Sequence, residues 1–261
     1  MILFQKGDHY SMGLNILLYV LVGFVAQMVD GALGMAYGVS SNTFLLSLGI
    51  PPAAASASVH MAEVVTTGIS GFSHWKLGNV DWKLVRRLLL PGVIGGVVGA
   101  YVLTSIDGNI LKPYIAAYLL LMGGIIIYKA FTMKSQHNLD EYHGPRVSIL
   151  GLVGGFCDAI GGGGWGPVVT STLVANGKHP RMTIGSVNFS EFFITLAESI
   201  TFVLALRFGQ YWQIILGLLI GGAIAAPLAA LLSQKLPLKT LMIVVGVLII
   251  ILSIRTIYLA I

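Results

Sequence analysis

The chain has 261 residues and a net charge of +5; 56% of its residues are hydrophobic and 10% are charged. An ordinary soluble domain carries about 25% charged residues, so this chain lacks the polar groups that a water-facing surface needs. Its single cysteine, Cys157, excludes an intrachain disulfide framework or a cysteine zinc site. The basic residues are too scattered for a nucleic-acid surface. The composition therefore predicts a multi-pass protein of the lipid bilayer that binds no nucleic acid.

The apolar part of the chain begins after a short polar tail, and two of its stretches are broken midway. These two, 14–48 and 147–176, are interrupted by Asp30-Gly-Ala-Leu-Gly34 and by Asp158-Ala-Ile-Gly-Gly-Gly-Gly164. Because glycine costs about 1 kcal/mol in a helix interior, each is predicted to form two short helices joined by an unwound turn. Six other stretches have the length of about 20 residues that a membrane-spanning helix needs. They are 53–73, 84–105, 111–131, 182–206, 211–232 and 240–260.

The two halves of the chain are related by an internal repeat with an offset of 128 residues. Ten of the 38 positions from 30 to 67 are identical at this offset, among them an aspartate, a proline and a glutamate. An apolar bias alone does not produce such polar identities. The predicted units are the N-terminal tail 1–13, the first repeat 14–131, the linker 132–146 and the second repeat 147–261.

The lysine and arginine residues indicate how the repeats are oriented. If each broken stretch is a hairpin that returns to its starting side, eleven of the 15 basic residues share one face of the membrane. If each is a single crossing, the split is ten to five. The positive-inside rule then favours the hairpin, with both termini outside the cell. The predicted fold is therefore an all-α polytopic membrane protein of two inverted repeats, each a broken, re-entrant helical hairpin plus three transmembrane helices.

Polar side chains lie near the predicted membrane midplane in the first unbroken helix of each repeat. At 1.5 Å per residue, His60 and Glu63 are about 12 and 16 Å from the start of their helix. Asn188 and Glu191 occupy the equivalent depth in the second repeat. Carboxylates at this depth indicate function. The alternative is a structural role, in which they bond to hairpin amides or serines.

The glycine turns are candidates for anion binding. Unwound glycines leave backbone N–H groups unpaired, and the following short helix adds the positive end of its dipole. The alternative is close packing of small residues between helices. The residues concerned are Gly161, Gly162, Gly163, Gly164 and Trp165 in the second repeat, and Gly31 and Gly34 in the first.

Three neighbouring side chains and the linker have simpler interpretations. Asp30 and Asp158 precede the turns and are expected to cap the short helices that follow, with proton coupling as the alternative. Cys157 is expected to be a small apolar filler rather than a reactive thiol. The histidines and carboxylates of the linker 132–146 belong to a solvated segment rather than to a metal site. We therefore predict no metal and no cofactor.

Two motifs resemble one family of membrane proteins. They are Gln27-Met-Val-Asp-Gly-Ala-Leu-Gly34, followed by Pro51-Pro52, and Gly154-Gly-Phe-Cys-Asp-Ala-Ile-Gly-Gly-Gly-Gly-Trp-Gly-Pro167, followed by Pro180. With the two similar halves, they resemble the TauE/SafE family, the sulfite-exporter-like membrane proteins, from about residue 14 to 260. The resemblance implies a transporter, not an enzyme, that moves sulfite, sulfonates or related sulfur-containing anions, generally outward.

We therefore predict a secondary transporter that exports a small sulfur-containing oxyanion, such as sulfite or an organosulfonate, across the cytoplasmic membrane. Glu63 and Glu191, if they titrate, would couple proton movement. The alternatives are a passive anion channel and an intramembrane enzyme with Cys157 as its nucleophile. A homodimer, the identity of the anion and the coupling ion are left open. Besides the glycine turns, the predicted donors to the anion are Ser58, His60, Ser186 and Asn188.

Overall fold

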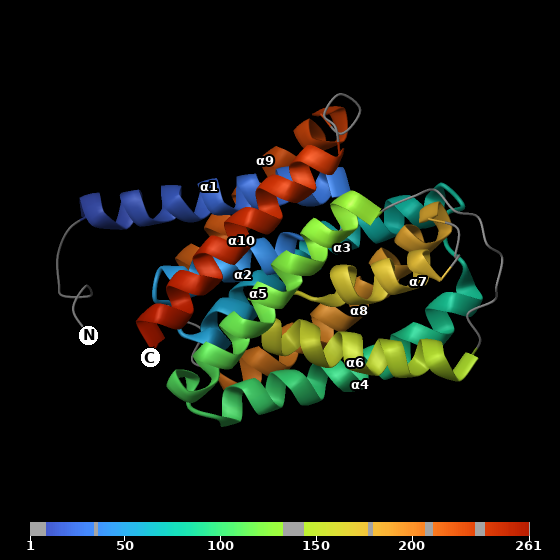
Figure 1. Cartoon of the computed structure of the whole chain (residues 1–261), viewed down its shortest axis with the longest axis horizontal. Coiled ribbons are helices and arrows are strands. Elements are labelled where there is room, and N and C mark those ends of the chain that lie inside the picture. Colours follow the sequence, from blue (N-terminus) through green and yellow to red (C-terminus); the bar gives the residue numbers. More distant parts are fainter. Residues whose placement is uncertain are drawn as a thin grey trace.

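The computed structural model describes the chain as helices connected by short links (Figure 1). The first half contains α1 (His9–Leu33), α2 (Tyr37–Ser47), α3 (Pro52–Lys76), α4 (Trp82–Ser105) and α5 (Gly108–Thr132). The second half contains α6 (Gly144–Gly161), the π-helical turn η1 (Gly166–Thr170), α7 (Ser171–Ala175), α8 (Pro180–Ala205), α9 (Trp212–Leu232) and α10 (Leu238–Ala260). The residues described are 9–33, 36–132, 144–176, 180–206, 211–232 and 238–260, and within them no strand occurs.

Four helices in the described ranges are long and apolar enough to cross a membrane. α3, which was also predicted to span, is not among them, because its many serine, threonine and other polar residues lower its hydropathy; most of these residues are buried inside the protein. α9 contributes a shorter apolar helix, Trp212–Ala225. The all-α polytopic class is thereby confirmed. The four helical segments are Trp82–Ser105, Gly108–Thr132, Met182–Ala205 and Met242–Ala260.

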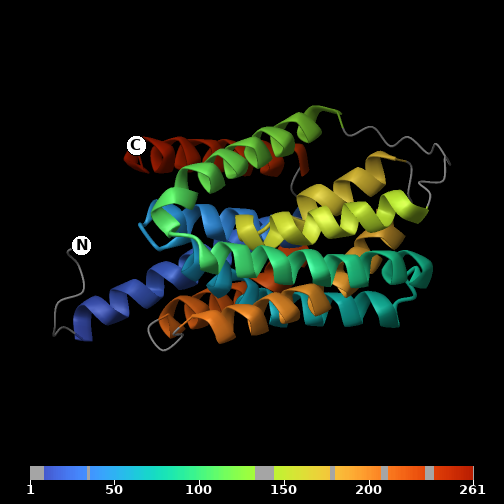
Figure 2. The ribbon, with the colours of Figure 1, turned by 90° about the horizontal axis from the view of Figure 1, so that it is seen from below.

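Equivalent helices of the two halves run in opposite directions. His60 of α3 lies next to Glu198 of α8, whereas Ser70, ten residues later on α3, bonds to Asn188, ten residues earlier on α8. α3 and α8 are therefore antiparallel, as the inverted-repeat prediction requires. α5 and α10 pack together in the same way, and α1 packs on α9 as α6 packs on α4 (Figures 1 and 2).

The broken stretches form the two hairpins that the sequence predicts. In Figure 1, α6 ends near the middle of the molecule, and η1 and α7 lead back toward the side from which α6 came. In the same way α1 is followed by α2, which packs against it. The start of α1 and the end of α10 lie on the same side of the molecule (Figure 1). A helical hairpin therefore opens each repeat, although its first arm in the first repeat, α1, has 25 residues and is longer than the short helix predicted.

The first break lies later in the chain than predicted. α1 stays helical through Leu33, so Gly31 is part of a helix and not of an unwound turn. The helix tolerates this glycine, since tertiary packing of α1 against α9 and α2 outweighs a cost of about 1 kcal/mol. Gly34, the other glycine predicted to bind anion in this half, lies outside the described residues. In the second half, α6 includes Gly161, and the unwound residues are 162–164.

Candidate functional site

Asp158 organises the second break. Its Oδ1 accepts hydrogen bonds from the backbone N–H groups of Gly164 at 2.7 Å and Trp165 at 2.8 Å, and its own carbonyl accepts from Gly163 N–H at 3.0 Å. Asp30 has the same role in the first repeat, since its Oδ1 accepts from Tyr37 N–H at 3.3 Å. The capping expected of both aspartates is confirmed. The expectation that the amides of this turn are unpaired is wrong for three of them, because Asp158 occupies them.

The tips of the two hairpins touch each other. Gly162 and Gly163 have φ values of +62° and +142°, which a glycine adopts without strain. A Cβ atom at Gly38, in the first turn of α2, would lie only 2.6 Å from the Cα of Gly163 and 2.9 Å from Oε1 of Glu63. Asn42 of α2 donates its amide to the carbonyl of Gly161 at 2.5 Å. Close packing of small residues, the alternative to anion binding, is therefore present at this turn.

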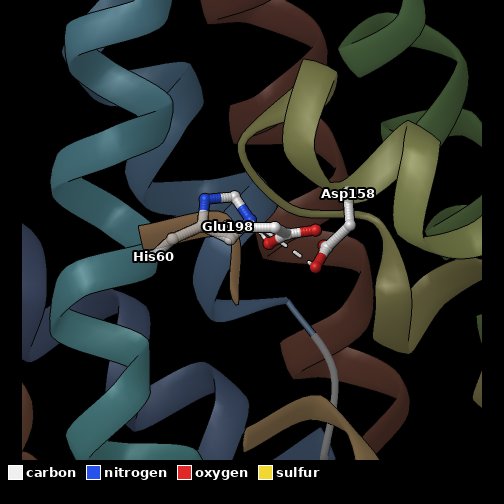
Figure 3. Close-up of side chains that lie close together, drawn as sticks. All are labelled: His60, Asp158 and Glu198. Carbon is white, nitrogen blue, oxygen red and sulfur yellow. Dashed lines mark ion pairs between the residues drawn. The ribbon is translucent and has the colours of Figure 1, made fainter. Parts of the chain in front are cut away.

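Three fully buried side chains converge beside the glycine turn (Figure 3). His60 of α3 places Nε2 at 2.8 Å from Oε2 of Glu198 on α8 and at 3.5 Å from Oδ2 of Asp158 on α6. We call these three residues the buried triad. Its members have exposed fractions of 0–1%. The triad joins both repeats at one point, because α3 belongs to the first repeat and α6 and α8 to the second.

The repeat relates this cluster to a neutral pair. At the offset of 128 residues, His60 corresponds to Asn188 and Glu198 corresponds to Ser70. In the structure Asn188 donates its amide to the hydroxyl of Ser70 at 2.8 Å. The α3–α8 contact thus has one charged end and one neutral end. The two halves have the same backbone arrangement here but different chemistry.

The two serines predicted to bind the anion use their hydroxyl protons inside the protein. Ser58 donates to the carbonyl of Ala54 at 2.7 Å, and Ser186 donates to that of Met182 at 2.7 Å. Ser186 also accepts from Asp81 N–H at 2.8 Å and so fastens the link between α3 and α4. Neither serine meets the buried triad through a hydrogen bond in the described structure.

Trp165 and the two repeat-related glutamates differ in how they are held. The indole of Trp165 is completely buried and donates to the carbonyl of Val187 at 3.2 Å. Glu63 is 5% exposed, and its Oε2 has no hydrogen-bond partner among the described residues. Glu191 is partly buried, one helical turn beyond Asn188. Of the two glutamates, Glu63 lies against the hairpin tips, next to Gly38.

Glu198 is the site residue that the sequence analysis missed. The repeat comparison passes over it, since its counterpart at the offset of 128 residues is a serine. A signal did exist: Glu198 follows Glu191 by seven residues, so the two lie on one stripe of the same helix, together with Thr195. A second carboxylate on that stripe, at membrane depth, is reason enough to single out the residue.

Inverted repeats whose broken hairpins meet at the centre, with ionisable side chains buried between them, are the architecture of a membrane transporter. The comparison with known families is specific. The family model of the sulfite exporter TauE/SafE matches residues 19–256. The chain therefore belongs to the TauE/SafE family, and the names of the family and of its relatives mark it as a membrane transporter and not an enzyme.

Individual relatives agree with this assignment. The chain is 44% identical to the probable membrane transporter protein YtnM of Bacillus subtilis (strain 168), over 93% of this chain and 82% of the relative. It is 28% identical to the probable membrane transporter protein ORF9 of a Sinorhizobium species, over 60% of each chain. A plant relative, sulfite exporter TauE/SafE family protein 3 of Arabidopsis thaliana, is 25% identical over 43% of this chain and 22% of its own length. No solved structure matches the chain significantly.

Proposed function

We propose that this transporter exports a small sulfur-containing oxyanion, such as sulfite or an organosulfonate, across the cytoplasmic membrane. The observation that carries the proposal is the contact between the two hairpin tips, Gly38 against Gly163, at the centre of two inverted repeats. In inverted-repeat transporters the substrate binds near the midplane, at discontinuous helices. The name of the plant relative, a sulfite exporter family protein, supports the substrate class.

The anion binds at the hairpin tips. The residues that bind it are the hydrogen-bond donors there that have no other partner. The amides of Gly163, Gly164 and Trp165 serve Asp158 in the described conformation. Buried hydroxyls just after the breaks have no partner among the described residues, namely Ser40, Ser41 and Thr170. These hydroxyls supply the first hydrogen bonds, and His60, Asn188 and the glycine amides join as one repeat rocks against the other. The contact between the two turns therefore changes as the transporter alternates between its inward-open and outward-open states.

Glu63 couples the anion to protons, and Glu191 is its counterpart in the other repeat. Glu63 faces the hairpin tip with an oxygen that has no partner. An anion beside an ionised carboxylate is repelled, so a proton on Glu63 favours the loaded state. A proton that leaves with a singly charged anion cancels its charge, so this coupled export responds to the pH gradient, whereas an anion that leaves alone is favoured by about 2.3 kcal/mol per 100 mV of negative-inside potential.

Transport by purified protein in liposomes tests this function. Vesicles loaded with sulfite, sulfate, thiosulfate, taurine or sulfoacetate are given a pH gradient or a membrane potential, and efflux is followed. We expect uphill efflux of at least one sulfur anion and loss of its pH dependence in Glu63→Gln, with anion binding retained. Downhill flux alone indicates the passive channel. Failure of every sulfur anion to move, or to raise the melting temperature, would overturn the proposed substrate class; a ligand at 100 times its Kd adds about 2.7 kcal/mol.

A further inference from the structure

The buried triad contains short contacts that are not hydrogen bonds. His60 Nε2 lies 2.8 Å from Glu198 Oε2, at the distance of an ion pair, yet neither atom has a hydrogen-bond partner among the described residues. Asp158 Oδ2 and Glu198 Oε1 are also without partners. Burying an ionised carboxylate without partners costs several kcal/mol. Four polar atoms of the triad therefore lack a hydrogen bond among the described residues, and their charges are balanced only where a positive charge, a proton on His60 or a cation, lies between the ring and the carboxylates.

The orientation of the neutral His60 ring places a nitrogen lone pair against these two carboxylates. Its Nδ1 lies 2.7 Å from the carbonyl oxygen of Ser56, which can only accept a hydrogen bond. Nδ1 therefore carries the proton, and in the neutral ring Nε2 presents a lone pair to two carboxylate oxygens. A lone pair facing anionic oxygens is repulsive unless a positive charge lies between them. A ring nitrogen whose partner N–H is held by a backbone carbonyl is the arrangement typical of histidine metal ligands.

The two carboxylates are held in place as firmly as the ring. Asp158 uses Oδ1 to accept from two amides, which fixes its Oδ2 toward His60 (Figure 3). Glu198 is seated against Gly96 of α4, where an added Cβ would lie 2.8 Å from Cγ and 2.9 Å from Cδ of the glutamate. Each ligand atom thus has an independent support. The site is preorganised.

We propose that His60 Nε2, Asp158 Oδ2 and the carboxylate of Glu198 bind one divalent transition-metal ion, such as Zn²⁺. One ligand atom from each side chain lies within 4.8 Å of the other two. Zn–N and Zn–O bonds of about 2.0–2.2 Å place tetrahedral ligand atoms about 3.3 Å apart. The observed separations from Nε2, 2.8 and 3.5 Å, lie on either side of that value. One nitrogen and two oxygen ligands suit zinc and its first-row neighbours.

A metal ion here has a consequence for the anion, and this step rests on the proposed function. A neutral His60 with ionised Asp158 and Glu198 carries a charge of −2, which repels an incoming anion. A divalent cation cancels that charge. Three protein ligands also leave a fourth position open, as in zinc sites that bind substrate. The metal would thus let an oxyanion enter the centre of the transporter as its fourth ligand, and His60 would then hold the anion through the metal and not through a direct hydrogen bond.

Metal content is the direct test, and it requires no knowledge of the anion. The full chain is purified in detergent, incubated with Zn²⁺, freed of excess ion and analysed by elemental mass spectrometry. We expect about one zinc per chain in the wild type and loss of most of it in Glu198→Gln. Glu191→Gln is the matched control, a carboxylate two turns away on the same helix, and it should retain the metal. Gly96→Ala, which displaces the Glu198 carboxylate without removing a charge, should weaken binding as well.

A measurement on the unaltered protein guards against variants that do not fold. Zn²⁺ should raise the melting temperature of chelator-treated wild type, and a chelator should reverse the rise. If Zn²⁺, Mn²⁺ and Co²⁺ neither bind nor stabilise the wild type, the triad shares protons only and the proposal is overturned. Equal loss of zinc in Glu191→Gln also overturns it. Failure of sulfite transport leaves these outcomes unaffected, so the two proposals fail separately.

Discussion

The contact between the two hairpin tips can be tested with a single methyl group. Gly163 combines a φ of +142° with a position against the backbone of Gly38 and Val39, which a Cβ atom would overlap. Gly49, in the link between α2 and α3, also has a positive φ, +87°, but a Cβ there would meet no atom within 4 Å. Gly49→Ala therefore reports backbone strain alone, whereas Gly163→Ala reports strain plus the contact between hairpins.

The expected magnitudes follow from these two costs. A non-glycine residue in a sparsely populated region of φ costs about 1–3 kcal/mol, which is the whole expected effect of Gly49→Ala. Forcing an extra carbon into a packed interior costs a further 1–3 kcal/mol or so, which brings Gly163→Ala to roughly 2–6 kcal/mol. At about 2–4 °C per kcal/mol for a chain of this size, the contact lowers the melting temperature by about 2–12 °C beyond the control.

The assay is thermal unfolding of both variants in the same detergent, followed by anion efflux from liposomes. Gly163→Ala should melt below Gly49→Ala and should lose transport even where the protein is still folded, because the tips can no longer meet. Equal melting temperatures for the two variants would refute the reasoning. That result would mean that the hairpins separate at no cost, and the proposed centre of alternating access would lie elsewhere.

Three further predictions concern other parts of the molecule. Asn42→Ala removes the donor to the Gly161 carbonyl and should destabilise the protein by about 1–3 kcal/mol in thermal melts; an unchanged melt would contradict it. Asn188→Ala should weaken sulfite affinity roughly 10- to 150-fold if its amide reaches the anion, while Ser70→Ala, which removes only its present partner, should bind nearly as wild type. A reporter fused after Ile261 should be active outside the cytoplasm, and cytoplasmic activity would reject the predicted orientation.

The sequence by itself determined the class of fold and the existence of two breaks, although the first break lies later in the chain than predicted. Those properties depend on local composition: apolar runs long enough to span, glycines that disfavour a helix, and aspartates placed to cap the next one. The internal repeat predicted that the two halves have the same arrangement of helices, since residues such as Asp30 and Asp158 are identical at equivalent positions. Capping was predictable for the same reason, because the donor amides lie only six or seven residues after each aspartate.

Only the tertiary structure decided what the central residues face. His60 and Glu198 are far apart in the chain, and neither local pattern nor repeat symmetry pairs them, because the symmetric pair is the neutral Asn188–Ser70. Asp158 caps the turn with one oxygen, and its second oxygen lies near His60. This second contact also depends on how α6 packs beside α3. Contacts between residues so far apart in the chain depend on how whole helices pack together, and this packing forms the buried site at the centre of the protein.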